Sequence, residues 1–251
     1  MKAWIARYKY FIVLFLVILP ISRDVYAAAQ TIPLVVSKQA GNTVTYDLSI
    51  KILMLMAVLT VLPALLITMT AFTRIAIVLA ILRQAIGIPN VPSNQILIGL
   101  TLIMTLFVMM PIIQKVNDTS LQPYIEGKIT EQQALETTGS SIKTFMLKQT
   151  RKSDLKVFVD LSHTKVLDHD YPLLVVMPAY ITSELKTAFE IGFLIFLPFL
   201  ILDLVIASIL MSMGMMMLSP MVISLPFKLL FFVLVDGWSL VVTSLITSFR
   251  I

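Results

Sequence analysis

Cysteine is absent from the 251 residues of the chain. Its absence excludes disulfide bonds, thiolate metal sites and cysteine nucleophiles. Charged residues are scarce as well, at 13% of the chain, whereas soluble domains usually carry about a quarter. Hydrophobic residues reach 58%, and the mean hydropathy is +0.94. So few charges cannot cover a surface that faces water on every side, and lipid or other protein chains must therefore cover much of it.

Motifs for catalysis and nucleotide binding are also missing. The chain has no Walker loop, no GxSxG, no HExxH and no GxGxxG before a helix. The net charge is +5, and no cluster of Lys and Arg has the density of a nucleic-acid site. The sequence therefore predicts neither an enzyme nor a nucleic-acid-binding protein, and it predicts no cofactor.

The charges that are present gather in one block of the sequence. More than half of them lie in residues 114–186, and few lie in the apolar blocks 48–113 and 187–251. Before these blocks, basic residues, an apolar run and small residues follow one another as in a secretory signal. We expect 1–29 to be a cleaved signal peptide and 30–47 a short periplasmic segment. The alternative is an uncleaved first span.

Each apolar block has room for two membrane spans. Residues 52–73 are uncharged and, at about 1.5 Å per residue, would cross a hydrocarbon layer of about 30 Å. A second run covers 96–113, and the last block holds runs over 187–212 and 214–249. In the polar block, Thr130 before an acidic residue predicts a helix start. The predicted fold class is all-α: a polytopic helical membrane protein of bent helical hairpins with a small helical periplasmic domain.

Three residues predict bends or hinges in the last apolar run: Gly214, Pro220 and Pro226. Glycine lets the backbone turn, and proline breaks helix hydrogen bonding. In hydrocarbon the freed backbone groups must be satisfied by protein or water. This requirement favours a bent hairpin packed in an assembly over a lone rod that faces lipid.

The arginines after the first apolar run indicate its orientation. Arg74 and Arg83 have no acidic neighbour, and the positive-inside rule places them on the cytoplasmic side. The polar block is then periplasmic, and residues 211–217 form a turn that faces the cytoplasm.

Six charged residues lie in or beside the last apolar block, where an unpaired charge facing lipid would be costly. Lys186 and Glu190 have the i, i+4 spacing of a helical ion pair. Asp203 and Asp236 are more isolated. They either pair with basic residues on neighbouring helices or subunits, for which Lys228 is suited, or take part in a proton relay. The candidate interhelix or intersubunit charges are Glu184, Lys186, Glu190, Asp203, Lys228 and Asp236.

Two histidines, His163 and His169, lie among aspartates in the polar block. A metal site there is one interpretation, but the side chains lack the i, i+4 spacing of helical ligand pairs. We therefore favour a solvated loop and predict no metal site.

A run of methionines surrounds Gly214. Methionine is unbranched, apolar and flexible, so several copies can close a hole and repack around varied shapes. The alternatives are ordinary core packing and a thioether copper site, although neither His nor Cys accompanies the run. We favour a deformable seal made by Met211, Met213, Met215, Met216 and Met217.

Several ordered strings resemble the FliP family of flagellar export proteins, over about residues 48–249. The strings closest to that family's pattern are ITSELKTAF and IGFLIFLPF over 181–199 and MSMGMMMLSP over 211–220. They also include ISLPFKL over 223–229, VDGW over 235–238, FTRI over 72–75 and LRQA over 82–85.

The resemblance implies a function that spacing alone does not. Several copies, as a pentamer, would assemble with FliQ and FliR into a ring-like helical gate in the bacterial inner membrane, within the flagellar basal body. Other membrane proteins of the export apparatus would adjoin it, and unfolded flagellar proteins would pass through it. The methionine run would be the gasket around the channel. The resemblance also implies that the apolar hairpins can be raised out of the bilayer.

Other functions stay open at this point. The signal sequence and the large periplasmic block favour the flagellar proteins over their injectisome relatives, which are the first alternative. A proton-coupled small-solute transporter built on Asp203 and Asp236 belongs to another class. A scaffold without a conduction path is the third.

Overall fold

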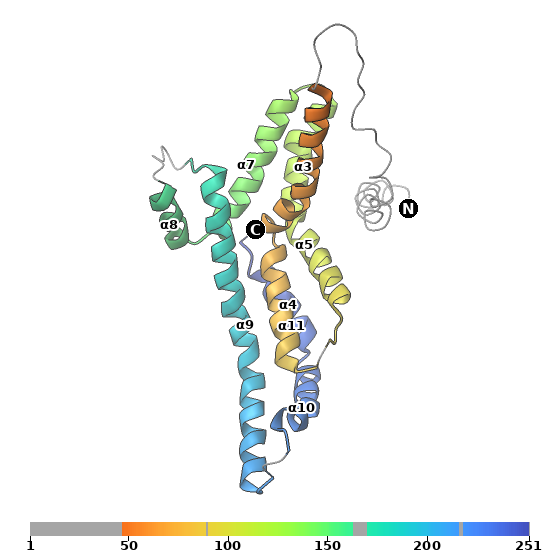
Figure 1. Ribbon diagram of the computed structural model, residues 1–251, viewed down its shortest axis with the longest axis vertical. Coiled ribbons are helices and arrows are strands. Elements are labelled where there is room, and N and C mark those ends of the chain that lie inside the picture. Colours follow the sequence, from red (N-terminus) through yellow and green to blue (C-terminus); the bar gives the residue numbers. More distant parts are fainter. Residues whose placement is uncertain (1–46, 89, 163–169, 216–217, 251) are drawn as a thin grey trace. The chain divides into compact units, whose positions relative to one another are not determined.

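The computed structural model describes residues 47–88, 90–162, 170–215 and 218–250 (Figure 1). All regular elements in these ranges are helices, which confirms the predicted all-α class for the described part of the chain. The chain forms two compact units, residues 1–61 and 62–251. The described part of the first unit belongs to α3 (Asp47–Thr68). The predicted signal peptide lies outside the described residues.

The larger unit consists of helices joined by short connections. Helix α5 continues without interruption into a π-helical turn and the short α6. The elements are α4 (Phe72–Ile86), α5 (Asn94–Val116), η1 (Asn117–Leu121), α6 (Gln122–Ile125), α7 (Glu131–Gln149), α8 (Lys152–Ser162), α9 (Leu173–Ser212), α10 (Pro220–Leu234) and α11 (Gly237–Thr247).

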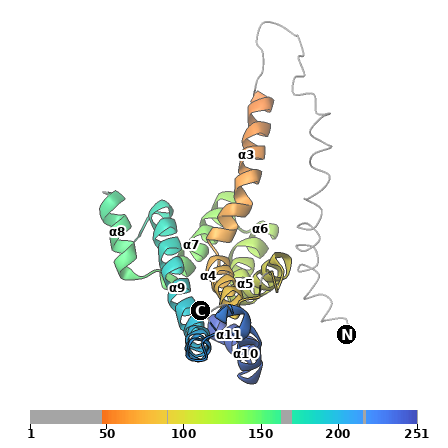
Figure 2. The same ribbon diagram turned by 60° about the horizontal axis from the view of Figure 1, so that its bottom comes forward.

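Helix α4 is the core of the larger unit and packs along α9 (Figures 1 and 2). Its residues Ile75, Val78, Leu79 and Leu82 recur at helical spacing and are fully buried. The same hydrophobic cluster includes residues of α5, α9, α10 and α11. The sequence does not predict α4 as a separate helix, because its apolar stretch is too short for a span and carries two arginines.

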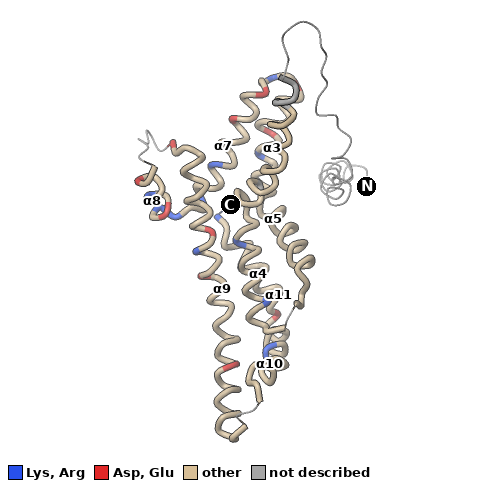
Figure 3. Tube along the Cα trace, in the orientation of Figure 1, with Lys and Arg blue, Asp and Glu red and all other residues tan. Residues whose placement is uncertain are grey.

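Helix α9 runs for 40 residues, which corresponds to about 60 Å. Its N-terminal half packs against α7 and α8, and its C-terminal half packs against α10. The predicted boundary between residues 186 and 187 falls inside this helix, which passes from the polar block into the apolar one. Figure 3 shows the same change, since charged positions gather on α7, α8 and the first half of α9.

The polar block confirms the predicted helix start. Thr130 caps α7 by accepting a hydrogen bond from the Gln133 amide at 3.4 Å, and the Gln133 side chain accepts from the Thr130 amide at 3.0 Å. This reciprocal capping box satisfies two backbone donors at the helix terminus. Phe145 of α7 then packs near Tyr180 of α9 in a second buried cluster.

The last apolar run forms α10 and α11, which are bent by 64°. The bend lies at Asp236, whose backbone is left-handed with φ 48°, and not at the predicted hinge residue Pro226, which lies inside α10. Pro220 is the first residue of α10, a position where the missing proline N–H costs nothing. A proline inside a helix removes one hydrogen bond, whereas the left-handed Asp236 turns the backbone itself.

Two helical stretches of the described chain are long and apolar enough to cross a membrane: residues 94–125 and 173–212. The bent pair of α10 and α11 would be a third if it acts as one span. Many large apolar side chains on these helices are exposed, including Phe107, Phe193 and Leu194. The larger unit therefore leaves apolar surface that its own helices do not cover.

Candidate functional site

The methionine run lies where α9 ends, and a Schellman motif fixes that end. The Met215 amide donates to the Leu210 carbonyl at 3.0 Å, and the Gly214 amide donates to the Met211 carbonyl at 3.1 Å. Gly214 has φ +74°, a left-handed conformation that glycine adopts without steric cost. Gly214 therefore turns the backbone at the end of α9 within a hydrogen-bonded helix cap, and its role as a hinge stays a prediction.

The methionine side chains at this cap project from the chain. Met211, Met213 and Met215 are 65%, 62% and 41% exposed, whereas Leu210 directly before them is buried. Met216 and Met217 lie outside the described residues. The described thioethers are therefore presented by a fixed helix end and are free to contact another surface.

A polar cross-brace joins α9, α10 and α4 between this cap and the core. Asp203 of α9 pairs with Lys228 of α10 at 2.6 Å and accepts a hydrogen bond from Ser224 at 2.5 Å. The Lys228 ammonium, which is almost fully buried, also donates to the Ala85 carbonyl at 3.3 Å. The sequence predicts both Asp203 and Asp236 as possible partners of Lys228, and the structure pairs Lys228 with Asp203. Asp203 therefore joins α9 to α10 through an ammonium and a hydroxyl of the same chain, which favours the pairing alternative over the relay.

A buried ion pair joins α4 to the N-terminal half of α9. Arg74 is 2% exposed and Glu184 is 0% exposed. The Arg74 Nε donates to one Glu184 oxygen at 2.7 Å, and Nη2 donates to the other. Nη1 donates to the carbonyl and hydroxyl of Ser248, both at 3.0 Å, and the guanidinium lies 4.0 Å from the centre of the Phe249 ring. One arginine thus ties three segments together.

This pair bears on the argument that placed Arg74 on the cytoplasmic side. The positive-inside rule applies to charges in loops near span ends, whereas Arg74 is inside a buried helix and neutralised by Glu184. Arg83 also lies in α4, half-buried, and donates to Asn94 Oδ1 at 2.5 Å. The cytoplasmic placement of Arg74 and Arg83 stays a prediction.

The predicted pair of Lys186 with Glu190 is replaced by a longer-range one. Arg151, between α7 and α8, donates through Nη1 and Nη2 to the two Glu190 oxygens at 3.1 and 2.5 Å. The hydrogen bond to Glu190 raises the pKa of Arg151 above its ordinary value. Lys186 attracts the Glu190 carboxylate electrostatically but forms no ion pair with it among the described residues. An arginine fork matches a carboxylate in two bonds at once, which a lysine four residues away cannot do.

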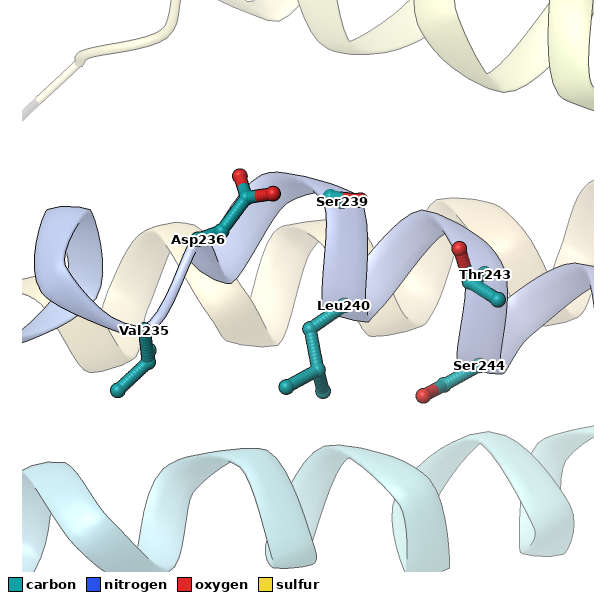
Figure 4. Close-up of a pocket in the computed structure, with 6 residues that line it drawn as sticks. All are labelled: Val235, Asp236, Ser239, Leu240, Thr243 and Ser244. Atoms are coloured by element: carbon teal, nitrogen blue, oxygen red, sulfur yellow. The ribbon is translucent and has the colours of Figure 1, made fainter.

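Asp236 borders a shallow cavity of about 280 Å³ on α11 (Figure 4). Ser239, Leu240, Thr243 and Ser244 line the cavity with it. Asp236 is exposed and has no ion pair among the residues that the structure describes. Like Lys186, it is a predicted charge that the described part of the chain leaves open to a partner. His163 and His169 lie outside the described residues.

Sequence reasoning missed the polar residues that complete these contacts. Ser183 is buried, accepts from the Arg151 amide at 3.0 Å and donates to Asp154 at 2.7 Å. Ser224 plays the corresponding part beside Asp203. Ser224 lies four residues before Lys228 on the same helical face, and that spacing was the available signal. Ser183 is adjacent in sequence to Glu184 but on another face, so no such signal marked it.

Comparison with known proteins places the chain. The FliP family model matches residues 55–245. The flagellar biosynthetic protein FliP of Cereibacter sphaeroides is 54% identical over 216 residues, which are 85% of this chain and 71% of that protein. The protein of that name from Aquifex aeolicus is 46% identical over 229 residues, 90% of this chain and 95% of its own. The one from Bacillus subtilis is 50% identical over 203 residues, with 80% and 92% covered. The chain therefore belongs to the FliP family.

Proposed function

We propose that this chain is a subunit of the flagellar type III protein export gate in the bacterial inner membrane. Several copies, as a pentamer, form the channel with FliQ and FliR, next to other membrane proteins of the export apparatus. Unfolded flagellar proteins cross the membrane through it. The gasket that closes the channel consists of Met211, Met213, Met215, Met216 and Met217.

The observation that carries the gasket is the contrast between a fixed backbone and exposed flexible side chains at the end of α9. The Schellman cap and the Asp203–Lys228 brace hold the helix end in position. The thioether side chains extend from it and are not buried by their own chain. Flexible apolar side chains on a rigid support can close against their counterparts and repack around a passing polypeptide. One chain cannot do this alone, so the seal belongs to the oligomer.

The exposed apolar surface supports both an assembly and a membrane environment. Exposed apolar patches of this extent mark contact with lipid or protein. Helix α9 is about twice as long as a hydrocarbon layer is thick, so its polar N-terminal half projects beyond any layer that its apolar half enters. Asp236 is exposed beside an apolar helix, where an unpaired charge facing lipid would be costly. Its exposure therefore favours a neighbouring chain that offers a hydrogen-bond donor or a cation.

The relatives support the flagellar branch of the family over injectisome proteins, because those reported above carry flagellar names at 46% to 54% identity. The pairing of Asp203 with Lys228 and Ser224 gives this carboxylate a structural role within its own chain, which favours the export gate over the proton-coupled transporter. The sequence holds no nucleotide motif, so the energy for export would come from other components.

Cysteine cross-linking in membranes tests the assembly. Because the chain has no cysteine, any disulfide between copies must run through an introduced one. We expect Met213→Cys to give covalent dimers under mild oxidation, since gasket residues of neighbouring copies meet at one axis. Leu161→Cys is the control, because Leu161 is as exposed but lies on α8. Equal cross-linking at both positions, or none at position 213 in an intact complex, would contradict the proposal.

A further inference from the structure

Three basic side chains surround one cavity that has no assigned role. The cavity holds about 150 Å³ and lies between the end of α5, α7 and the C-terminal segment. Lys115, Lys148 and Arg250 line it, and no acidic residue does. The remaining lining residues are Pro111, Ile112, Ser141, Thr144 and Phe145.

Hydrogen bonds hold the backbone of Arg250 in place across 101 positions of sequence. Gln149, which is buried at the end of α7, donates to the Arg250 carbonyl at 2.9 Å. Its carbonyl oxygen accepts from the Arg250 amide at 3.2 Å. Just before it, Ser248 is held by the buried Arg74. The C-terminal segment is therefore fixed against α7, and this places Arg250 at the edge of the cavity.

The charge around the cavity is unbalanced. Lys143 and Arg151 form ion pairs with carboxylates of the same chain. Lys115, Lys148 and Arg250 form none among the described residues. The acid next in sequence, Asp118, accepts a hydrogen bond from Asn117 and does not line the cavity. Cations brought together without a counter-charge repel one another, and a bound anion relieves that repulsion.

The walls of the cavity indicate which anion would fit. Pro111 and Ile112 of α5 and Phe145 of α7 contribute apolar walls. The apolar surface of α5 continues along the helix, where Phe107 and Ile103 are 63% and 68% exposed. Lys115 is in the last turn of α5, where an apolar helix meets the polar headgroup layer of a membrane. Phosphate oxygens suit the three cations and the Thr144 hydroxyl, and acyl chains suit the exposed face of α5.

We propose that this cavity binds the phosphate group of an anionic phospholipid whose acyl chains lie along α5. The proposal rests on the membrane environment given under the proposed function and on α5 entering it, since residues 94–125 are long and apolar enough to cross a membrane. The lipid would join α5, α7 and the C-terminal segment, and so would stabilise the same clamp that Arg74 makes from the other side. Basic pockets beside membrane helices are known lipid headgroup sites.

The test uses the purified gate complex. Phosphatidylglycerol retained per complex is counted by native mass spectrometry, and the delipidated complex is titrated with phosphatidylglycerol, phosphatidylethanolamine or inorganic phosphate. The site variants are Lys115→Gln, Lys148→Gln and Arg250→Gln, singly and together. The matched control removes three exposed cations elsewhere, Lys152→Gln, Lys156→Gln and Lys186→Gln.

We expect each single variant to weaken phosphatidylglycerol binding about fivefold and the triple variant on the order of 100-fold, with the control within about twofold. Equal weakening in the control, unchanged retention in the triple variant, or inorganic phosphate binding as tightly as the lipid would overturn the proposal. Loss of the complex in every single variant would assign the cavity to a subunit contact and overturn it as well. Failure of the unmodified chain to form a complex would instead contradict the proposed function.

Discussion

The two ends of α9 use their side chains in opposite ways. At the N-terminal half, Glu184 and Glu190 are matched by arginines of the same chain, and Ser183 completes the contacts. At the C-terminal end, methionine side chains extend outward from a capped helix and contact little of their own chain. The contacts of Glu184 and Glu190, here called the frame, are complete within one chain. The methionine run at 211–217, here called the tip, needs other chains to contact. Substitutions in the frame should act on stability, and substitutions at the tip should act on closure.

The largest expected effect is Arg74→Ala in the frame. It leaves the fully buried Glu184 carboxylate without a partner, which should destabilise the fold by about 3–5 kcal/mol. Thermal unfolding of the purified protein measures the loss. Arg83→Ala is the control, since that half-buried side chain bonds only Asn94, and should cost about 1 kcal/mol or less. Equal melting temperatures for the two variants would remove the distinction between a buried clamp and a peripheral contact.

Gly192→Ala should have the next largest effect. A Cβ at residue 192 would overlap the Ile81 side chain, where α4 and α9 touch, and such overpacking typically costs about 1–3 kcal/mol. Gly139→Ala in α7 is the matched control. It meets nothing within 4 Å and should gain about 0.5–1 kcal/mol, because alanine favours a helix. Chemical denaturation reports both changes, and their opposite signs are the test.

Gly214→Ala should cost only about 1–2 kcal/mol, the strain of a left-handed alanine. Gly127→Ala is matched in conformation, with φ +70° and open space, but lies between α6 and α7. We expect similar small losses of stability in both and an ion leak in the Gly214 variant alone, because misplacing the cap misplaces the methionines. A leak in both variants would break the separation of frame from tip.

The sequence predicts what depends on local pattern. The start of α7 follows from Thr130 and its neighbours, and the glycine within the methionine run marks the end of α9. The sequence also predicts Lys228 as a partner of Asp203, because few other cations lie in the last apolar block.

The sequence does not predict what depends on distant segments meeting. Arg74 and Glu184 are 110 positions apart, so the arginine resembles a loop charge until α4 is packed on α9. Glu190 has a partner at the favourable helical spacing in Lys186, yet the fork of Arg151 arrives from another helix. The bend at Asp236 is missed because the two prolines are the stronger local signals, whereas a left-handed aspartate has no local sequence signal of that strength.

The central claim is that the methionines close a channel made by several chains. Ionic conductance of the reconstituted gate, with the run at 211–217 changed from methionine to alanine, tests it most directly. The control is Met146→Leu, a buried core exchange of similar volume. We predict a closed gate for the unmodified and control proteins and a steady ion leak for the alanine variant at unchanged assembly. A fully assembled alanine variant that stays closed would contradict the account.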